Sequence, residues 1–152
     1  MNRYVLDTNI LIIYIRDKQI KQFVEEKYHP FDPPNLPLVS IVSVGELKAF
    51  ALMNKWGNKR LSKIETFLEQ AIITDINSRD IINKYAEIDA FSQGRLENKP
   101  LGLSARNMGK NDIWIAATAS VTDSILLTTD RDFIHLNAIF CQIEKISLAS
   151  IK

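Results

Sequence analysis

The sequence has little of several residue types, and each shortage excludes a class of protein. Cys141 is the only cysteine among 152 residues, so an intramolecular disulfide and a cysteine zinc site are both excluded. Five glycines and five prolines are too few for a fibrous or loop-rich chain and favour a compact one. Nineteen basic and eighteen acidic residues leave a net charge of +1, so any contact with a polyanion must be local.

Long hydrophobic runs are also missing. The apolar stretch Ile10–Ile15 is far shorter than the ~18 residues that a membrane span requires. The residues from Met1 to Asp7 have neither the apolar run nor the small-residue cleavage site of a signal peptide. We therefore expect a soluble, cytoplasmic protein that forms one domain over residues 1–152 and makes no membrane contact.

What the chain does contain is an alternation of strand-like and helix-like segments. Short apolar or β-branched runs predict strands at 4–6, 38–42, 72–75, 124–128 and 139–143. Capped or amphipathic stretches predict helices at 10–16, 20–28, 43–54, 61–71, 78–97 and 112–121. The segment 30–37 carries four prolines and is expected to connect elements outside any helix or central strand. This alternation predicts an α/β protein whose mainly parallel sheet is covered on both faces.

Acidic residues fall where these strands end or the following helices begin. They are Asp7, Glu46, Asp112, Asp130 and Asp132. In parallel α/β sheets, ligands bind beyond the carboxyl ends of the strands, which is where these acids are expected. Each acid also has a simpler explanation, because helix N-termini favour negative charge. Thr8 or Asn9, Ser43 and Asn111 are the expected helix caps, and Ser43 with Glu46 forms an S-x-x-E capping box.

Considered together, the acids predict a metal site. Carboxylates gathered at one edge of a sheet repel one another unless a cation lies among them. Hard oxygen ligands select Mg²⁺ or Mn²⁺, which activate water and neutralise charge on a phosphate during phosphodiester hydrolysis. Cys141 lies in an apolar run and is expected to be a buried structural thiol, so it does not compete as a nucleophile.

Four short motifs occur in order along the chain: Leu6-Asp7-Thr8-Asn9, Ser43-x-x-Glu46-Leu47, Asn111-Asp112-x-x-Ile115-Ala116-Ala117 and Leu127-Thr128-Thr129-Asp130-Arg131-Asp132-Phe133. Their order and approximate spacing resemble a PIN-domain ribonuclease, and most closely the VapC-type toxins of bacterial toxin–antitoxin (VapBC) systems. The resemblance extends from residue 4 to about residue 145. It implies a PIN-like three-layer α/β/α sandwich and a Mg²⁺- or Mn²⁺-dependent endoribonuclease that is the toxin of a type II system.

The resemblance also implies a role for each matching residue. The acidic positions that hold metal and catalyse hydrolysis in the family match Asp7, Glu46, Asp112 and Asp130. Asp132 matches a frequently acidic position, and it either supports the metal or only shapes the turn. The residues that would support the metal ligands by hydrogen bonds are Thr8, Asn9 and Thr128.

Partners follow from the resemblance and from the charge of the site. Family members commonly form homodimers and are inhibited by a cognate VapB-type antitoxin. An acidic site alone repels RNA, so basic residues must hold the phosphates. The candidates are Arg106, Lys110, Arg131 and Lys48. Trp56 could stack on a base, whereas Trp114 lies within an apolar helix and favours the core.

Two other functions stay open at this point. The first is a PIN nuclease that acts in RNA processing or on DNA without an antitoxin. The second is a non-catalytic PIN-like binding module that uses its acids only as helix caps. The Asn98–Lys110 segment and the proline-rich connector depart from the family's pattern, so substrate preference is the property that transfers least.

Overall fold

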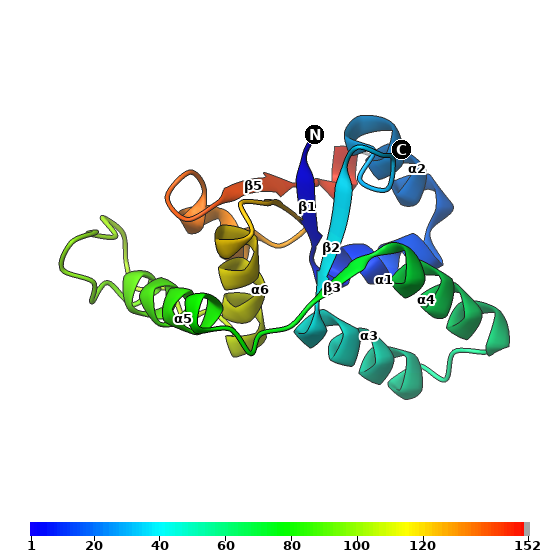
Figure 1. The fold of residues 1–152 in the computed structure, drawn as a ribbon, viewed down its shortest axis with the longest axis horizontal. Coiled ribbons are helices and arrows are strands. Elements are labelled where there is room, and N and C mark those ends of the chain that lie inside the picture. The colour runs from blue at the N-terminus through cyan, green and yellow to red at the C-terminus, as the bar shows by residue number, and fades with distance from the viewer. Residues whose placement is uncertain (151–152) are drawn as a thin grey trace.

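Five short strands form one all-parallel sheet in the order β3-β2-β1-β4-β5, as seen in the computed structural model of the chain (Figure 1). The structure describes residues 1–150. The strands are β1 (Arg3–Leu6), β2 (Leu36–Ser40), β3 (Ile72–Thr74), β4 (Ile125–Thr128) and β5 (Gln142–Lys145). The prediction of an α/β protein with a mainly parallel central sheet is confirmed.

Helices connect the strands, because parallel strands need a long crossover between them. The α-helices are α1 (Thr8–Arg16), α2 (Lys18–Tyr28), α3 (Ile41–Met53), α4 (Asn58–Gln70), α5 (Arg79–Ser92) and α6 (Lys110–Val121). The 3₁₀ helices η1 (Arg131–Leu136) and η2 (Leu148–Ser150) follow β4 and β5. Over residues 1–150, none of these helices has the length and hydropathy needed to cross a bilayer.

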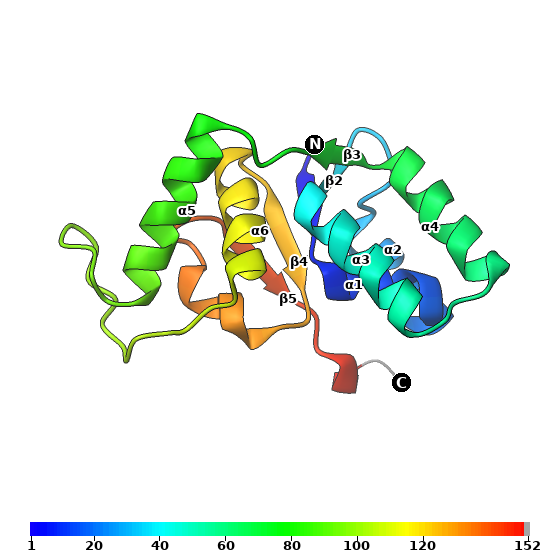
Figure 2. The same ribbon diagram turned by 90° about the horizontal axis from the view of Figure 1, so that it is seen from below.

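The sheet separates two hydrophobic cores, because successive side chains of a strand point to opposite faces. On β1, Val5 packs into the core beneath α5 and α6, whereas Tyr4 and Leu6 pack into the core beneath α1–α4. Figure 2 shows the resulting layers, with α5 and α6 on one side of the sheet and α1–α4 on the other. The three-layer α/β/α sandwich implied by the sequence resemblance is therefore present.

The second strand ends two residues earlier than expected. Ser40, rather than Ser43, is the N-cap of α3, and its Oγ accepts a hydrogen bond from the Val42 amide at 3.2 Å. Ile41 and Val42 form the first turn of the helix, because a capping serine at the end of the sheet outweighs their weak preference for strand. Glu46 consequently lies in the second turn of α3, and the predicted capping box is absent.

Two other boundaries shift for local reasons. Helix α5 ends at Ser92 rather than near residue 97, because Gly94 adopts a left-handed conformation (φ 72°) that terminates the helix. Strand β5 begins at Gln142 rather than at Ile139. The Ala138 amide donates to the Cys141 carbonyl at 2.9 Å, and this turn takes up the apolar residues that were expected to start the strand.

The proline-rich connector extends into the sheet, contrary to expectation. Pro37 lies in β2 and pairs with Tyr4 of β1. Strand β3 pairs with β2 only from Leu38 onward. On that side Pro37 therefore has no neighbouring strand, and its missing N–H loses no ladder hydrogen bond there.

Candidate active site

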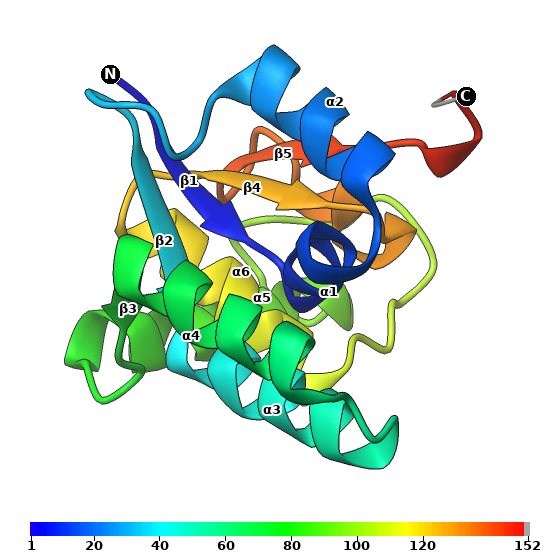
Figure 3. The same ribbon diagram turned by 90° about the vertical axis from the view of Figure 1, so that its right-hand side faces the viewer.

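The carboxyl ends of β1 and β4 lie side by side at the centre of the sheet, and polar residues follow both strands. Leu6 pairs with Leu127, and the Asp7 amide donates to the Leu127 carbonyl at 3.0 Å. Figure 3 shows the two strands next to each other, with α1 beginning where β1 ends. This arrangement brings Asp7 and Thr128 together, although the two residues are 121 positions apart in the sequence.

Asp7 is buried, with 4% of its surface exposed, and both of its carboxylate oxygens are engaged. Oδ1 accepts from the Thr8 amide at 2.8 Å, which makes Asp7 the N-cap of α1. Oδ2 accepts from the Thr128 hydroxyl at 2.8 Å, and that hydroxyl accepts from the Asp130 amide at 3.0 Å. The expectation that Thr8 or Asn9 caps this helix is wrong, because Asp7 occupies the capping position.

Glu46 reaches the site from α3 and is held by residues of α1 and α6. The Thr8 hydroxyl donates to Glu46 Oε1 at 2.7 Å and lies 3.0 Å from the Ser43 hydroxyl. Asn111 Nδ2 donates to Glu46 Oε2 at 3.2 Å. Gly109, rather than Asn111, is the N-cap of α6. Three residues predicted to cap helices, Thr8, Ser43 and Asn111, therefore make hydrogen bonds at the site instead.

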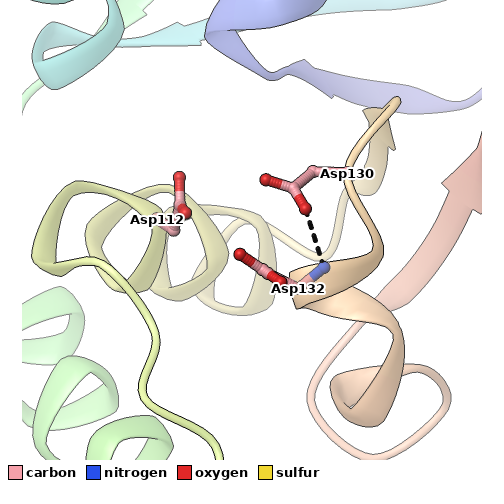
Figure 4. Close-up of side chains that lie close together, drawn as sticks. All are labelled: Asp112, Asp130 and Asp132. Atoms are coloured by element: carbon pink, nitrogen blue, oxygen red, sulfur yellow. Dashed lines mark hydrogen bonds between the residues drawn. The ribbon is translucent and has the colours of Figure 1, made fainter.

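Three aspartates, Asp112, Asp130 and Asp132, lie close together at the same edge of the sheet, and Figure 4 shows their carboxylates facing one another. Asp112, Asp130 and Asp132 each offer a carboxylate oxygen, and these oxygens all lie within 4.8 Å of one another. Asp112 is in the first turn of α6, and the other two are in the turn after β4. The Asp132 amide donates to Asp130 Oδ1 at 2.9 Å and stabilises that turn. Within residues 1–150, no lysine or arginine forms an ion pair with any of the site's carboxylates.

The carboxylates raise one another's pKa values because their negative charges are close and partly buried. Burial raises the pKa of Asp7 to about 6, the Thr128 and Thr8 hydrogen bonds oppose the rise, and the charge of Glu46 adds to it. Burial also raises the pKa of Asp112 to about 7, with further increases from the four other carboxylates of the site. The folded chain thus holds repelling negative charge that its own cations do not neutralise.

This donor set fits a hard divalent cation. Asp112, Asp130 and Asp132 offer only carboxylate oxygens, and Asp7 and Glu46 lie close enough to raise the pKa of Asp112. Mg²⁺ and Mn²⁺ prefer oxygen ligands, whereas zinc and copper sites use histidine or cysteine. A bound cation would also relieve the repulsion that raises the pKa values.

The remaining predicted site residues differ in whether they adjoin the acidic cluster. Asn9 is exposed in the first turn of α1, and its side chain forms no hydrogen bond within the described part of the chain. Lys110 begins α6 and Arg131 begins η1, so both adjoin the acids, and both are exposed. Arg106 is exposed in the loop before α6. Lys48 instead lies 3.9 Å from Glu65 of α4.

The aromatic and sulfur candidates have structural roles. Trp56 is buried, packs edge-on against Phe50 with ring centroids 5.5 Å apart and has the Arg60 guanidinium 5.5 Å from its ring centroid, so it is not an exposed platform for a base. Trp114 is half-buried and packs on Tyr85 with centroids 4.2 Å apart. Cys141 is half-buried, and burial raises its thiol pKa to about 12, which makes it a poor nucleophile.

Sequence reasoning missed Ser43 and Asn111 as site contacts because both match helix-capping patterns. Two signals were available. Ser43 and Glu46 are three positions apart and therefore lie on the same face of a helix. Asn111 directly precedes Asp112, so its side chain emerges at the same helix end.

These features define an α/β protein with an acidic site at the centre of a parallel sheet. The sequence model of the PIN domain matches residues 4–139, and the chain belongs to the PIN domain family. No curated protein matches the sequence.

Solved structures of toxin–antitoxin complexes share the fold. One is VapBC2 from Rickettsia felis bound to a DNA fragment from its promoter, at 23% identity and a TM-score of 0.72, covering 95% of this chain and 99% of that chain. VapBC-1 from nontypeable Haemophilus influenzae has 23% identity and a TM-score of 0.66, with coverages of 94% and 97%. VapBC-5 from Mycobacterium tuberculosis has 19% identity and a TM-score of 0.61, with coverages of 96% and 100%.

Proposed function

We propose that this PIN domain is a Mg²⁺- or Mn²⁺-dependent endoribonuclease that hydrolyses RNA phosphodiester bonds. The observation that carries the proposal is the convergence of Asp112, Asp130 and Asp132 beside the buried Asp7 in a chain of the PIN domain family. Helix capping alone does not account for it, because Glu46 lies outside the first turn of α3, yet its charge contributes to raising the pKa of Asp112.

The proposed ligands are Asp7, Glu46, Asp112 and Asp130, with Asp132 as an additional donor. A divalent cation bound there supplies an activated water and neutralises charge on the scissile phosphate. The chain's own part is to hold the carboxylates in place. Thr128 and Thr8 orient Asp7 and Glu46 through the hydrogen bonds described above, as residues behind metal ligands do elsewhere.

RNA binding requires positive charge next to this acidic centre. We propose that Lys110 and Arg131 contact phosphates, since each directly begins an element that carries one of the acids. Arg106 lies in the loop that leads into α6 and is proposed for the same role. Lys48 is the weakest member of the set, because it is close to Glu65. The logarithm of the RNA-binding constant falls linearly with the logarithm of the salt concentration. Loss of one phosphate contact should reduce the steepness of this line by ~0.7 for a single strand.

We further propose that the protein is the toxin of a type II toxin–antitoxin system, works in the cytoplasm as a homodimer, and forms one PIN domain over its whole length. Support for a VapB-type antitoxin comes from the solved structures of similar fold, which are of VapBC proteins. Co-expression with the product of a neighbouring antitoxin gene tests for the antitoxin. Light scattering on the purified protein then tests for the homodimer. Monomeric protein that binds no neighbouring product would contradict this part of the proposal.

The nuclease proposal is tested on total cellular RNA. Purified protein is incubated with RNA and Mn²⁺, beside the Asp7→Asn variant and a sample containing EDTA. We expect discrete cleavage that is lost in both controls, and the ends of the fragments then identify the target. A different pair of results would favour a non-catalytic binding module: the folded wild-type protein leaves the RNA intact, and Mn²⁺ does not raise its melting temperature.

A further inference from the structure

The last residue of α5 makes a buried polar contact outside the acidic cluster. Ser92 is fully buried (0% exposed), and its Oγ lies 2.7 Å from Nε2 of His135 in η1. The same hydroxyl lies 3.4 Å from the sulfur of Met108. The Ser92 carbonyl accepts a hydrogen bond from the Arg106 amide at 2.6 Å. Ser92 therefore joins the end of α5, the helix η1 and the loop that precedes α6.

The His135 ring also packs against an aromatic neighbour. It lies parallel to the Phe91 ring, with centroids 6.2 Å apart and an angle of 4° between the planes. The Ser92 hydroxyl can donate to Nε2 in the tautomer that carries the ring proton on Nδ1.

A serine–histidine pair at this distance resembles a nucleophile with its base, but burial excludes that role. Ser92 has no exposed surface, and Met108, which is 8% exposed, covers its hydroxyl. No substrate atom can reach the oxygen without opening the core. The pair must act through the segments that it joins.

We propose that Ser92 and His135 are positioning residues for the acidic site. On one side, His135 and Asp132 lie three residues apart in the short helix η1, so an anchor on His135 also holds the segment that carries Asp132. On the other side, the residues anchored by Ser92 lead directly to Gly109 and Asp112 at the start of α6. The contact thus ties the turn that carries Asp130 and Asp132 to the loop that carries Asp112.

Such a tie is needed because the carboxylates it brings together repel one another. The loop from residue 93 to residue 109 has no helix or strand to hold it. Without an anchor, repulsion would move the start of α6 away from the turn after β4 in the metal-free protein. Holding both in place preserves the spacing that a cation requires and avoids the cost of reordering the loop when it binds. This inference rests on the proposed function, since it assigns the pair a role toward a bound metal.

The test compares variants that remove the contact with one that only weakens the same core. Ser92→Ala removes the hydroxyl, and His135→Leu removes the acceptor while keeping an apolar side chain against Phe91. His135→Gln restores an acceptor. The matched control is Phe140→Leu, because Phe140 packs on Phe91 with centroids 5.2 Å apart but forms no ring stacking or hydrogen bond with Ser92 or His135 within residues 1–150. Each variant is titrated with Mn²⁺ by thermal shift and assayed for kcat and KM on RNA.

We expect the dissociation constant for Mn²⁺ to rise by ~10-fold in Ser92→Ala and His135→Leu. The kcat should fall in these variants while the KM for RNA stays constant. His135→Gln should recover most of the affinity. Phe140→Leu should melt at a lower temperature and bind Mn²⁺ as the wild type does. Wild-type Mn²⁺ affinity in Ser92→Ala would overturn the inference.

A second measurement needs no metal and separates this inference from the proposed function. The Asp132 amide, which donates to Asp130 Oδ1, should exchange its hydrogen faster in metal-free Ser92→Ala than in Phe140→Leu. Equal exchange in the two variants would overturn the positioning role, even if wild-type protein binds Mn²⁺. If Mn²⁺ does not stabilise the wild type, the proposed function is contradicted. Faster exchange in Ser92→Ala would still show that the Ser92–His135 contact stabilises the turn.

Discussion

The two sides of the acidic site are built differently. On the side of β1 and α3, the carboxylates of Asp7 and Glu46 each accept two hydrogen bonds from the chain. On the side of α6, no group within residues 1–150 donates a hydrogen bond to the Asp112 carboxylate. The protein itself thus organises one side, whereas on the other side the oxygens of Asp112 stay available for an external cation.

The pKa values reflect this difference. Asp7 is the more deeply buried of the two aspartates, yet its pKa rises only to about 6, whereas that of Asp112 rises to about 7. Hydrogen bonds from Thr128 and Thr8 stabilise the charged form of Asp7 and oppose the effect of burial. Every contribution at Asp112 acts in the same direction. The lower pKa of Asp7 thus has two sources: it accepts hydrogen bonds that Asp112 lacks, and it has fewer charged neighbours than Asp112.

The largest effect is expected from Asp112→Asn, which removes a proposed ligand from the weakly held side. RNA cleavage should fall by at least ~10²-fold, because neutralisation of the transition state is lost. The melting temperature of the metal-free variant should rise, since repulsion is removed, and Mn²⁺ should no longer raise it. Asp123→Asn, at an exposed position just after α6, is the matched control. Cleavage at the wild-type rate by Asp112→Asn would contradict the assignment.

Thr128→Val tests the side of the site that the chain's own hydrogen bonds organise. It replaces the Thr128 hydroxyl by a methyl group of nearly the same size. Asp7 loses a donor and the Asp130 amide loses an acceptor in a fully buried position. We expect a decrease of ~1–3 kcal/mol in the free energy of unfolding, measured by urea denaturation. Thr129→Val is the control, because the Thr129 side chain forms no hydrogen bond within the described residues. Equal losses in both variants would show that the Asp7 contact contributes nothing.

The pH dependence of the metal-free protein sharpens the comparison further. Asp7 and Asp112 have folded-state pKa values of about 6 and about 7, above the ordinary value of 3.8. Between about pH 4 and pH 7 the folded state therefore binds more protons than the unfolded state, and the free energy of unfolding decreases as the pH rises. In Asp112→Asn, the melting temperature should fall less between about pH 4 and pH 7 than it does in the wild type. The difference should be a few degrees, since 1 kcal/mol corresponds to ~2–4 °C in a chain of this size. Parallel profiles for the two proteins would be evidence against the raised pKa of Asp112.

The smallest effect is expected from Asn111→Ala, which removes one exposed hydrogen bond to Glu46. Water replaces the lost donor, so stability should change by less than ~1 kcal/mol. The dissociation constant for Mn²⁺, measured by thermal shift, should rise by less than the ~10-fold typical of buried supporting contacts. Asn107→Ala in the preceding loop serves as the control. A loss as large as that of Asp112→Asn would mean that Asn111 is itself a ligand.

Much of the fold was predictable, because strand and helix periodicities are local properties. Each strand and α-helix lies at or near an expected segment, and the acids at strand ends were recognisable from the topology of parallel sheets. The errors occurred where two local signals compete. Ser40 and Ser43 both have the chemistry of a cap, and only the end of the sheet selects Ser40. Gly94 was available as a signal that α5 ends early.

By itself, the sequence determined the layers of the fold, the family and the acids that meet at the sheet. Residue type and spacing suffice for this, because burial patterns and right-handed crossovers leave few arrangements open. Only the tertiary structure decided how each carboxylate is held. Whether Thr8 caps a helix or donates to Glu46, and whether Ser92 faces solvent or His135, depends on distances between residues 38 and 43 positions apart. A linear pattern carries no such distances, since they are set when the two cores pack against the sheet.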